Sequence, residues 1–165
     1  LAPHQSSALP AVRLYYDPRP GGVQHEWREP DAALARLRVI DAWQQGPQLV
    51  VYNGHGNQHQ WASTVRSLPE PYLLGTNDVA ELHNLDRLAI VLAMTCLTGQ
   101  FADVSTSGAT LDERFLRQDN GGAAAVWSST AGYGSSWRAG RSWLLCPLWP
   151  TRLLPIHQQS LSLIW

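Results

Sequence analysis

Two stretches of sequence decide the fold of this chain: VVYNGHG at residues 50–56 and IVLAMTC at residues 90–96. Each is a short apolar run that ends at a reactive side chain, His55 in the first and Cys96 in the second. Runs of this kind, rich in Val, Ile and Leu and bounded by turn residues, are typical of strands buried on both faces, and therefore of parallel sheets covered by helices. Ligands of such sheets bind beyond the carboxyl ends of the strands. The sequence therefore predicts an imidazole and a thiol on one edge of one sheet.

Further strands are expected on either side of these two. Residues 12–16 alternate and are rich in aromatic side chains, which suits a strand. The second central strand is expected at residues 88–94, and another apolar run at residues 123–127 predicts a third buried strand. Strands that alternate with helices predict a parallel α/β sheet with right-handed crossovers.

Two helices are expected between the strands. The first spans residues 31–45, with Asp31 as its N-cap, and we expect its inner face to carry four apolar residues: Ala33, Leu34, Leu37 and Ile40. The second begins at Thr110, where Thr110 and Glu113 fit a capping box. Between these helices, residues 57–78 are expected to form a polar loop, and residues 79–87 a short helix or turn.

Size and composition exclude several classes of protein. The 165 residues suffice for one domain with a core, and the formal net charge of -1 gives no electrostatic case for binding nucleic acid. No segment is long and apolar enough to span a membrane, and no leader peptide is visible. The two cysteines form no disulfide framework, and no phosphate-binding or dinucleotide fingerprint follows a strand. We therefore expect no cofactor, and the oligomeric state stays undetermined.

A cysteine nucleophile with a histidine partner is the chemistry that this edge could perform. A free cysteine has a pKa of about 8.5, so a nearby imidazole must help to form the thiolate or protonate the leaving group. The oxyanion of the tetrahedral intermediate also needs donors, and backbone amides at a tight turn supply them best. Gly56 directly follows His55, so its amide is the obvious donor, and the amide of Cys96 is a second candidate.

Other interpretations of the same residues are weaker. A zinc site built from His55, His59 and Cys96 would need the two histidines on a helix, and the glycines around His55 disfavour one. His59 is therefore expected to be a polar loop residue, and we expect no metal. Trp61 could line a substrate cleft, but an aromatic residue in a long loop more often attaches that loop to the core.

Several of these motifs together resemble one family. Gly-His-Gly after a strand is similar to the histidine motif of the caspase-like cysteine peptidases of clan CD. Three later features resemble the gingipain family in particular: the turn CLTGQF at residues 96–101, the helix LDERFLR at 111–117 and the strand GGAAAVWSST at 121–130. The resemblance spans roughly residues 12–134 and depends on the order and spacing of the motifs.

The resemblance implies a caspase-like three-layer α/β/α sandwich with a mainly parallel sheet, truncated at both ends. It implies a cysteine-type endopeptidase acting on a peptide or protein substrate, with Cys96 as nucleophile and His55 as proton donor to the leaving amine. It also suggests a secreted or cell-surface location. Two alternatives stay open: a catalytically inactive fragment of this fold that serves as a binding or scaffold module, and a caspase-like protease of another lineage that acts within a larger machine.

Two segments depart from the family pattern. Gingipains that cut after basic residues use an acid in the substrate pocket, and Asp17 is the only upstream acid in a suitable place, although Asp before Pro is an ordinary turn residue. Residues 135–165 are rich in Trp, Arg and Pro and lack periodicity. We therefore expect residues 1–134 to be a partial gingipain-type catalytic domain, and residues 135–165 to be a tail that is frame-shifted or otherwise not its native continuation.

Overall fold

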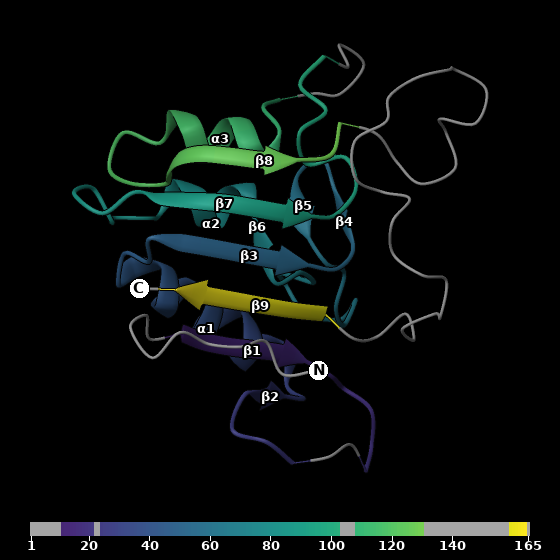
Figure 1. Cartoon of the computed structure of the whole chain (residues 1–165). Coiled ribbons are helices and arrows are strands. Elements are labelled where there is room, and N and C mark those ends of the chain that lie inside the picture. The colour runs from purple at the N-terminus through teal and green to yellow at the C-terminus, as the bar shows by residue number, and fades with distance from the viewer. Residues whose placement is uncertain (1–10, 22–23, 103–107, 131–158, 165) are drawn as a thin grey trace.

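A computed structural model describes residues 11–21, 24–102, 108–130 and 159–164, the last range by its backbone alone (Figure 1). The larger sheet has the order β2-β1-β9-β3-β7-β8 and contains β1 (Ala11–Tyr16), β2 (Arg28–Glu29), β3 (Leu49–Asn53), β7 (Ala89–Met94), β8 (Ala123–Ser128) and β9 (Gln159–Ile164). The smaller sheet has the order β4-β5-β6 and contains β4 (Gly56–Asn57), β5 (Gln60–Trp61) and β6 (Leu74–Gly75). The described helices are α1 (Ala32–Gln44), α2 (Thr76–Ala80) and α3 (Leu111–Arg117).

The larger sheet is mainly parallel, as the sequence predicts. β3 pairs in parallel with β7, β7 with β8, and β1 with β2. β9 is antiparallel to both of its neighbours, β1 and β3. Residues 159–164, which were not predicted to form a strand, therefore lie inside the sheet, whereas residues 131–158 fall outside the described part of the chain.

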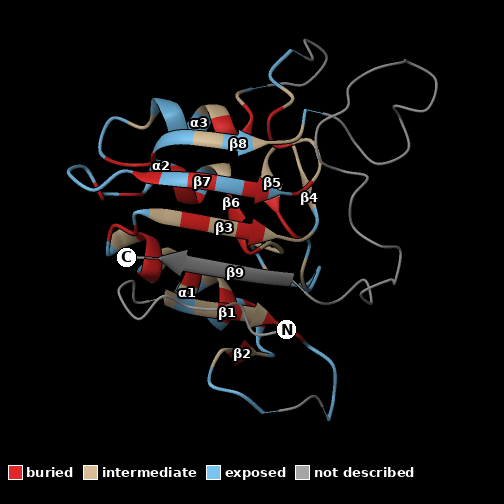
Figure 2. Ribbon diagram, viewed as in Figure 1, coloured by how far each residue is buried: buried red, intermediate tan, exposed pale blue. Residues whose placement is uncertain are grey.

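The described helices all cover the same face of this sheet (Figure 1). Burial along β7 alternates accordingly: Ala89, Val91 and Ala93 are buried, whereas the side chains of Ile90 and Met94 are 51% and 52% exposed (Figure 2). The expectation that this strand is buried on both faces is therefore wrong for the described residues. Both faces of the strand are apolar, but the helices of the described ranges cover one of them. The result is a mixed α/β fold with a mainly parallel sheet, consistent with a caspase-like architecture.

The first helix packs mainly through the opposite face from the predicted one: of the four residues expected to face inward, Ile40 is partly buried against the core, whereas Ala33, Leu34 and Leu37 are exposed. Asp31 caps it as expected, accepting from Leu34 N–H at 2.9 Å. Leu34 and Leu37, predicted to face inward, are both about half exposed. The buried face is instead made of Ala32, Ala35, Val39, Ala42 and Trp43. The large indole of Trp43 gains most from burial, and the alanines beside it let the helix approach the sheet closely.

The segment expected to be a polar loop contains the three strands of the smaller sheet, and α2 begins within it. Trp61, on β5, is only 1% exposed and stacks on Tyr52 of β3, with ring centroids 4.5 Å apart. Trp43 stacks in turn on Phe115 of α3 at 4.6 Å. Trp61 therefore attaches this segment to the core, because four aromatic rings from α1, β3, β5 and α3 pack together beneath the edge that carries the site.

The remaining predicted helix and strands are present with small changes of boundary, but β8 is not the buried strand that was expected: of its six residues only Ala123 is buried, and Trp127 is 58% exposed. The capping box of α3 is present: Thr110 N–H donates to Glu113 Oε2 at 2.9 Å, and Glu113 N–H donates to Thr110 Oγ1 at 3.3 Å.

None of the helices in the described ranges is long and apolar enough to cross a membrane.

Candidate active site

β3 and β7 are neighbouring parallel strands that end in register. Asn53 pairs with Met94, each the last residue of its strand, and Gly54 N–H donates to Met94 O at 3.3 Å. His55 follows Asn53 at the same interval as Cys96 follows Met94. β3 and β7 point the same way and end at the same edge of the sheet (Figure 1), and their register confirms the expectation that the backbones of His55 and Cys96 share this edge.

The core fixes the backbone of His55 while its side chain is exposed. Tyr52 Oη donates to His55 O at 2.6 Å, and Ala62 N–H donates to the same oxygen at 2.7 Å. Burial raises the pKa of Tyr52 well above its ordinary value, so the phenol stays protonated and remains a donor. The imidazole is therefore presented to solvent from an anchored backbone.

Gly56 forms the contact between the two reactive segments. A Cβ at this position would lie 2.4 Å from Thr95 Oγ1 and 3.3 Å from Cys96 O, so a larger residue does not fit without movement. β4 is an edge strand, and the bond from Ala62 N–H to His55 O makes Gly56 and Trp61 a non-hydrogen-bonded pair. The Gly56 N–H is therefore directed away from β5, as an oxyanion donor requires.

Cys96 lies in a tight turn after β7. Its thiol is free and half-buried, and Gln100 N–H donates to Leu97 O at 3.0 Å to close the turn. Thr95 and Thr98, on either side, are buried, and neither hydroxyl has a hydrogen-bond partner among the residues that the structure describes. The sulfur thus stands at the surface of a turn whose flanking side chains point inward.

Backbone strain is concentrated at these two segments. Ala62 and Leu97 are the described non-glycine residues with positive φ, at 61° and 65°. Ala62 holds the His55 carbonyl, and Leu97 directly follows Cys96. Residues held in this region cost on the order of 1–3 kcal/mol each and cluster at functional sites. Both strained positions therefore support a functional role for this edge.

The Cys96 turn rests on α3 and β8. Asp112 N–H donates to Thr98 O at 3.3 Å, and Gly99 N–H donates to Ser129 O at 3.1 Å. Ser128 Oγ donates to Asp112 Oδ2. Burial raises the pKa of Asp112, and the hydroxyls of Ser128 and Thr98 partly oppose this. The Thr98 hydroxyl lies near the carboxyl and lowers its pKa. Among the described residues, however, neither Thr98 Oγ1 nor Asp112 Oδ1 forms a hydrogen bond of good geometry.

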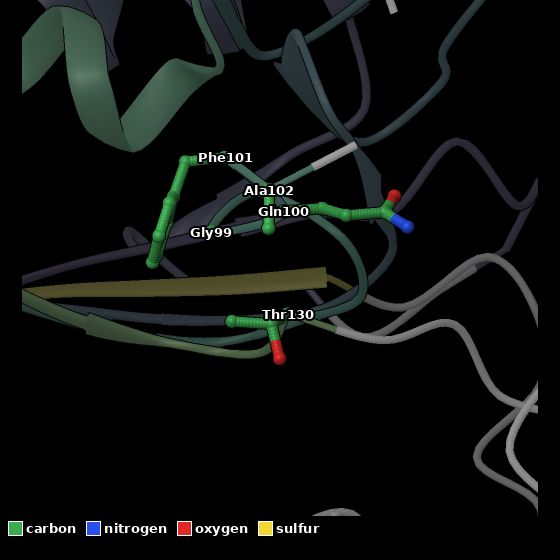
Figure 3. A pocket seen from close by; sticks show the side chains of 5 residues that line it. All are labelled: Gly99, Gln100, Phe101, Ala102 and Thr130. Atoms are coloured by element: carbon green, nitrogen blue, oxygen red, sulfur yellow. The ribbon is translucent and has the colours of Figure 1, made fainter. Parts of the chain in front are cut away.

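A cavity of about 570 Å³ lies beside the Cys96 turn, between it and the end of β8 (Figure 3). Five residues line it: Gly99, Gln100, Phe101, Ala102 and Thr130. Phe101 is 69% exposed, and the five lining residues include no charged side chain. A substrate side chain that entered this cavity would therefore meet apolar and uncharged polar atoms.

Asp17 is already paired with arginines. Its carboxylate binds Arg19 Nε at 2.7 Å and Arg28 Nε at 3.4 Å, and the hydrogen bonds from Arg19 hold its pKa well below the usual range. Arg28 also donates to the backbone oxygens of Asp17 and Arg19. The carboxylate therefore organises the turn after β1, and this pairing weighs against a role in binding a basic substrate side chain.

The zinc alternative finds no support in the described ranges, where no group of three or more potential ligands comes together. His59 lies in the turn between β4 and β5, where its N–H donates to Asn57 Oδ1 at 2.8 Å. It is thus a loop residue, as expected, and its imidazole has no described ligand partner.

Sequence reasoning missed Asp112, Ser128 and the strained Leu97. The sequence identifies Asp112 only as part of the beginning of a helix. A second acid beside the capping residue Glu113 could have indicated an additional contact of this side chain. The positive φ of Leu97 has no sequence signal, because glycine or asparagine would be the usual residue there.

The family model of peptidase family C25 matches residues 3–142. The mixed α/β fold with its mainly parallel sheet is consistent with a caspase-like cysteine peptidase domain. The chain belongs to peptidase family C25, the gingipain family of clan CD. The matched range continues beyond residue 134, the expected end of the catalytic domain. Searches of the curated proteins and of the solved structures gave no significant match.

Proposed function

We propose that this chain hydrolyses peptide bonds through a dyad of Cys96 and His55, with the Gly56 N–H as oxyanion donor. The contact at Gly56 is the observation that supports this best, since it joins the segment of His55 to that of Cys96 without room for a methyl group. Membership of a cysteine peptidase family and the common register of the two strand ends support it as well.

The reaction would proceed in two steps. The Cys96 thiolate attacks the carbonyl carbon of the scissile peptide, a C–S bond forms, and the negative charge moves to the carbonyl oxygen near the Gly56 N–H. The C–N bond then breaks as the His55 imidazolium gives its proton to the leaving amine. In the second step, His55 takes a proton from water, the hydroxide adds to the thioester carbon, and the thiolate leaves. The products are a free amine and a carboxylic acid.

Labelling of Cys96 with a peptidyl acyloxymethyl ketone tests the proposal. This probe reacts only where a thiolate lies beside a peptide-binding site, so intact mass should increase by one adduct that maps to residue 96. Cys96→Ala should abolish labelling, and His55→Ala should slow it by on the order of 100-fold or more. Cys96→Ala adds no bulk to the half-buried turn and leaves the fold testable by circular dichroism.

The alternative, an inactive domain that acts as a binding module, predicts a different result. A folded protein whose Cys96 reacts with iodoacetamide but not with a library of peptidyl probes would support that alternative. Loss of labelling in His55→Ala with an unchanged melting temperature would contradict it.

A further inference from the structure

We propose that Asp112 is a positioning residue that holds the segments of His55 and Cys96 at a fixed separation by fixing the first turn of α3 between them. The inference rests on the proposed function, because it concerns the spacing of the same dyad. Asp112 lies outside the proposed chemistry and would touch no reacting atom.

The first two amides of α3 each bind one of the two segments. Leu111 N–H donates to Gln58 O at 2.7 Å, and Gln58 lies in the β4–β5 turn that follows His55. Asp112 N–H donates to Thr98 O at 3.3 Å, in the turn that follows Cys96. One helix beginning therefore bridges the two loops, and its position sets the distance between them.

A side-chain bond joins the same two loops directly. Gln58 Nε2 donates to Gln100 Oε1 at 3.0 Å, two residues after Thr98 in the Cys96 turn. The turn is thus held at Thr98 by the helix and at Gln100 by the hairpin. Among the described residues, displacement of α3 would leave this amide pair, the contact at Gly56 and the bond from Gly54 N–H to Met94 O to connect the two segments.

The carboxylate of Asp112 anchors α3 in that position. Its side chain is buried, and Oδ2 accepts from Ser128 Oγ at the end of β8. A Cβ on Gly99 would lie 2.6 Å from Ser128 Oγ and 3.0 Å from Asp112 Oδ2, so the Cys96 turn packs directly on this bond. Helix, strand and turn therefore meet at one buried hydrogen bond.

Charge is not what makes this anchor work. No salt bridge of the described residues involves Asp112, and the acid beside it, Glu113, faces Thr110 and Arg117 instead. The groups that face the Asp112 carboxyl are the hydroxyls of Ser128 on β8 and Thr98 in the turn. An amide would keep the acceptor for Ser128 and could donate to the unpartnered Thr98 Oγ1.

Four variants of the full chain test this proposal: Asp112→Ala, Asp112→Asn, Ser128→Ala and, as matched control, Glu113→Gln. Two rates are measured for Cys96, one with the peptidyl acyloxymethyl ketone and one with iodoacetamide, which needs no aligned histidine or peptide site. We expect Asp112→Ala and Ser128→Ala to slow the peptidyl reaction at least tenfold, with iodoacetamide changed less than about twofold. Asp112→Asn should retain the peptidyl rate within about threefold.

The control separates positioning from stability. Glu113→Gln keeps the capping acceptor but removes the negative charge from the same helix turn and the ion pair with Arg117, without touching the Cys96 turn. It should therefore lower the melting temperature slightly and leave both rates unchanged. The double variant Asp112→Ala, Ser128→Ala should be no slower than either single variant, because both remove the same bond. Additive losses, or an equal loss in Glu113→Gln, would overturn the proposal.

Amide hydrogen exchange makes the test independent of activity. In Asp112→Ala and Ser128→Ala, the amides of Gly99 and Leu111 should exchange at least tenfold faster, whereas in Glu113→Gln the amide of Gly99 should not change. If the wild-type chain is unreactive towards peptidyl probes, the proposed function fails while exchange still decides the inference. Unchanged exchange at Gly99 in both variants would contradict the role of Asp112 even in an active enzyme.

Discussion

The loop that carries His55 and the turn that carries Cys96 are anchored by different kinds of interaction. The His55 loop is tied to stacked aromatic rings through Tyr52 and the residues around Trp61. The Cys96 turn rests on a buried carboxyl and two hydroxyls. The comparison teaches that the His55 loop is held against apolar packing, whereas the Cys96 turn is held by polar contacts around one buried carboxyl.

Removal of Trp61 should have the largest effect on the His55 side. This indole is 1% exposed, and Trp61→Ala should lower the free energy of unfolding by about 3–5 kcal/mol in urea titrations. Trp127→Ala is the matched control, because that side chain is 58% exposed on the uncovered face of β8 and its loss should cost less than about 0.5 kcal/mol. Equal costs would mean that the aromatic cluster does not anchor the loop.

A methyl group at Gly56 breaks the contact between the two segments. The Cβ would overlap with Thr95 Oγ1, so Gly56→Ala should cost about 1–3 kcal/mol of stability. Separation of the loops should also slow peptidyl labelling of Cys96 by on the order of 100-fold. Gly21→Ala adds a methyl group that meets nothing within 4 Å; because Gly21 has a φ of +71°, the change should cost about 1 kcal/mol of stability but leave labelling unchanged. A wild-type labelling rate in Gly56→Ala would show that the loops need not touch.

The Tyr52 hydroxyl offers a smaller change on the His55 side. Tyr52→Phe removes one of the two donors to His55 O, and the lost hydrogen bond should cost about 1 kcal/mol in thermal or urea unfolding. The ring keeps its stacking with Trp61, so the aromatic cluster stays intact. We expect a few-fold slower peptidyl labelling with no change in the iodoacetamide rate. A greater loss of stability than in Trp61→Ala would contradict this ranking.

The smallest expected effect is a pH dependence of stability on the Cys96 side. Burial raises the pKa of Asp112 above the ordinary value of 3.8 for an aspartate, so the folded chain binds this proton more tightly than the unfolded chain. The contribution of Asp112 to stability is therefore fully present below pH 3.8 and is lost as the pH rises through the raised value. Asp112→Asn should remove this component in urea titrations at several pH values. If Asp112 instead made the wild-type chain more stable as the pH rises, the fold would favour the ionised carboxylate, which would contradict this prediction.

The sequence predicts the strands and the common edge well, because apolar runs that end at His55 and Cys96 leave few alternatives. It predicts the wrong face for α1, since Leu34 and Leu37 are as apolar as the face that Trp43 buries. It also misses the hairpin between His55 and Trp61, whose strands are too short to show alternation. The support from Asp112 and Ser128 depends on residues far apart in sequence, so only the packed structure reveals it.

The close fit of Gly56 against Thr95 has a consequence for the history of this domain. Two positions on separate strand ends share one small volume, so an enlarged side chain at either position calls for a smaller one at the other. Thr95→Ala would free the space that Gly56→Ala fills, and the pair should be tolerated better than the single change at residue 56. Positions 56 and 95 are therefore expected to change together during evolution, and not one at a time.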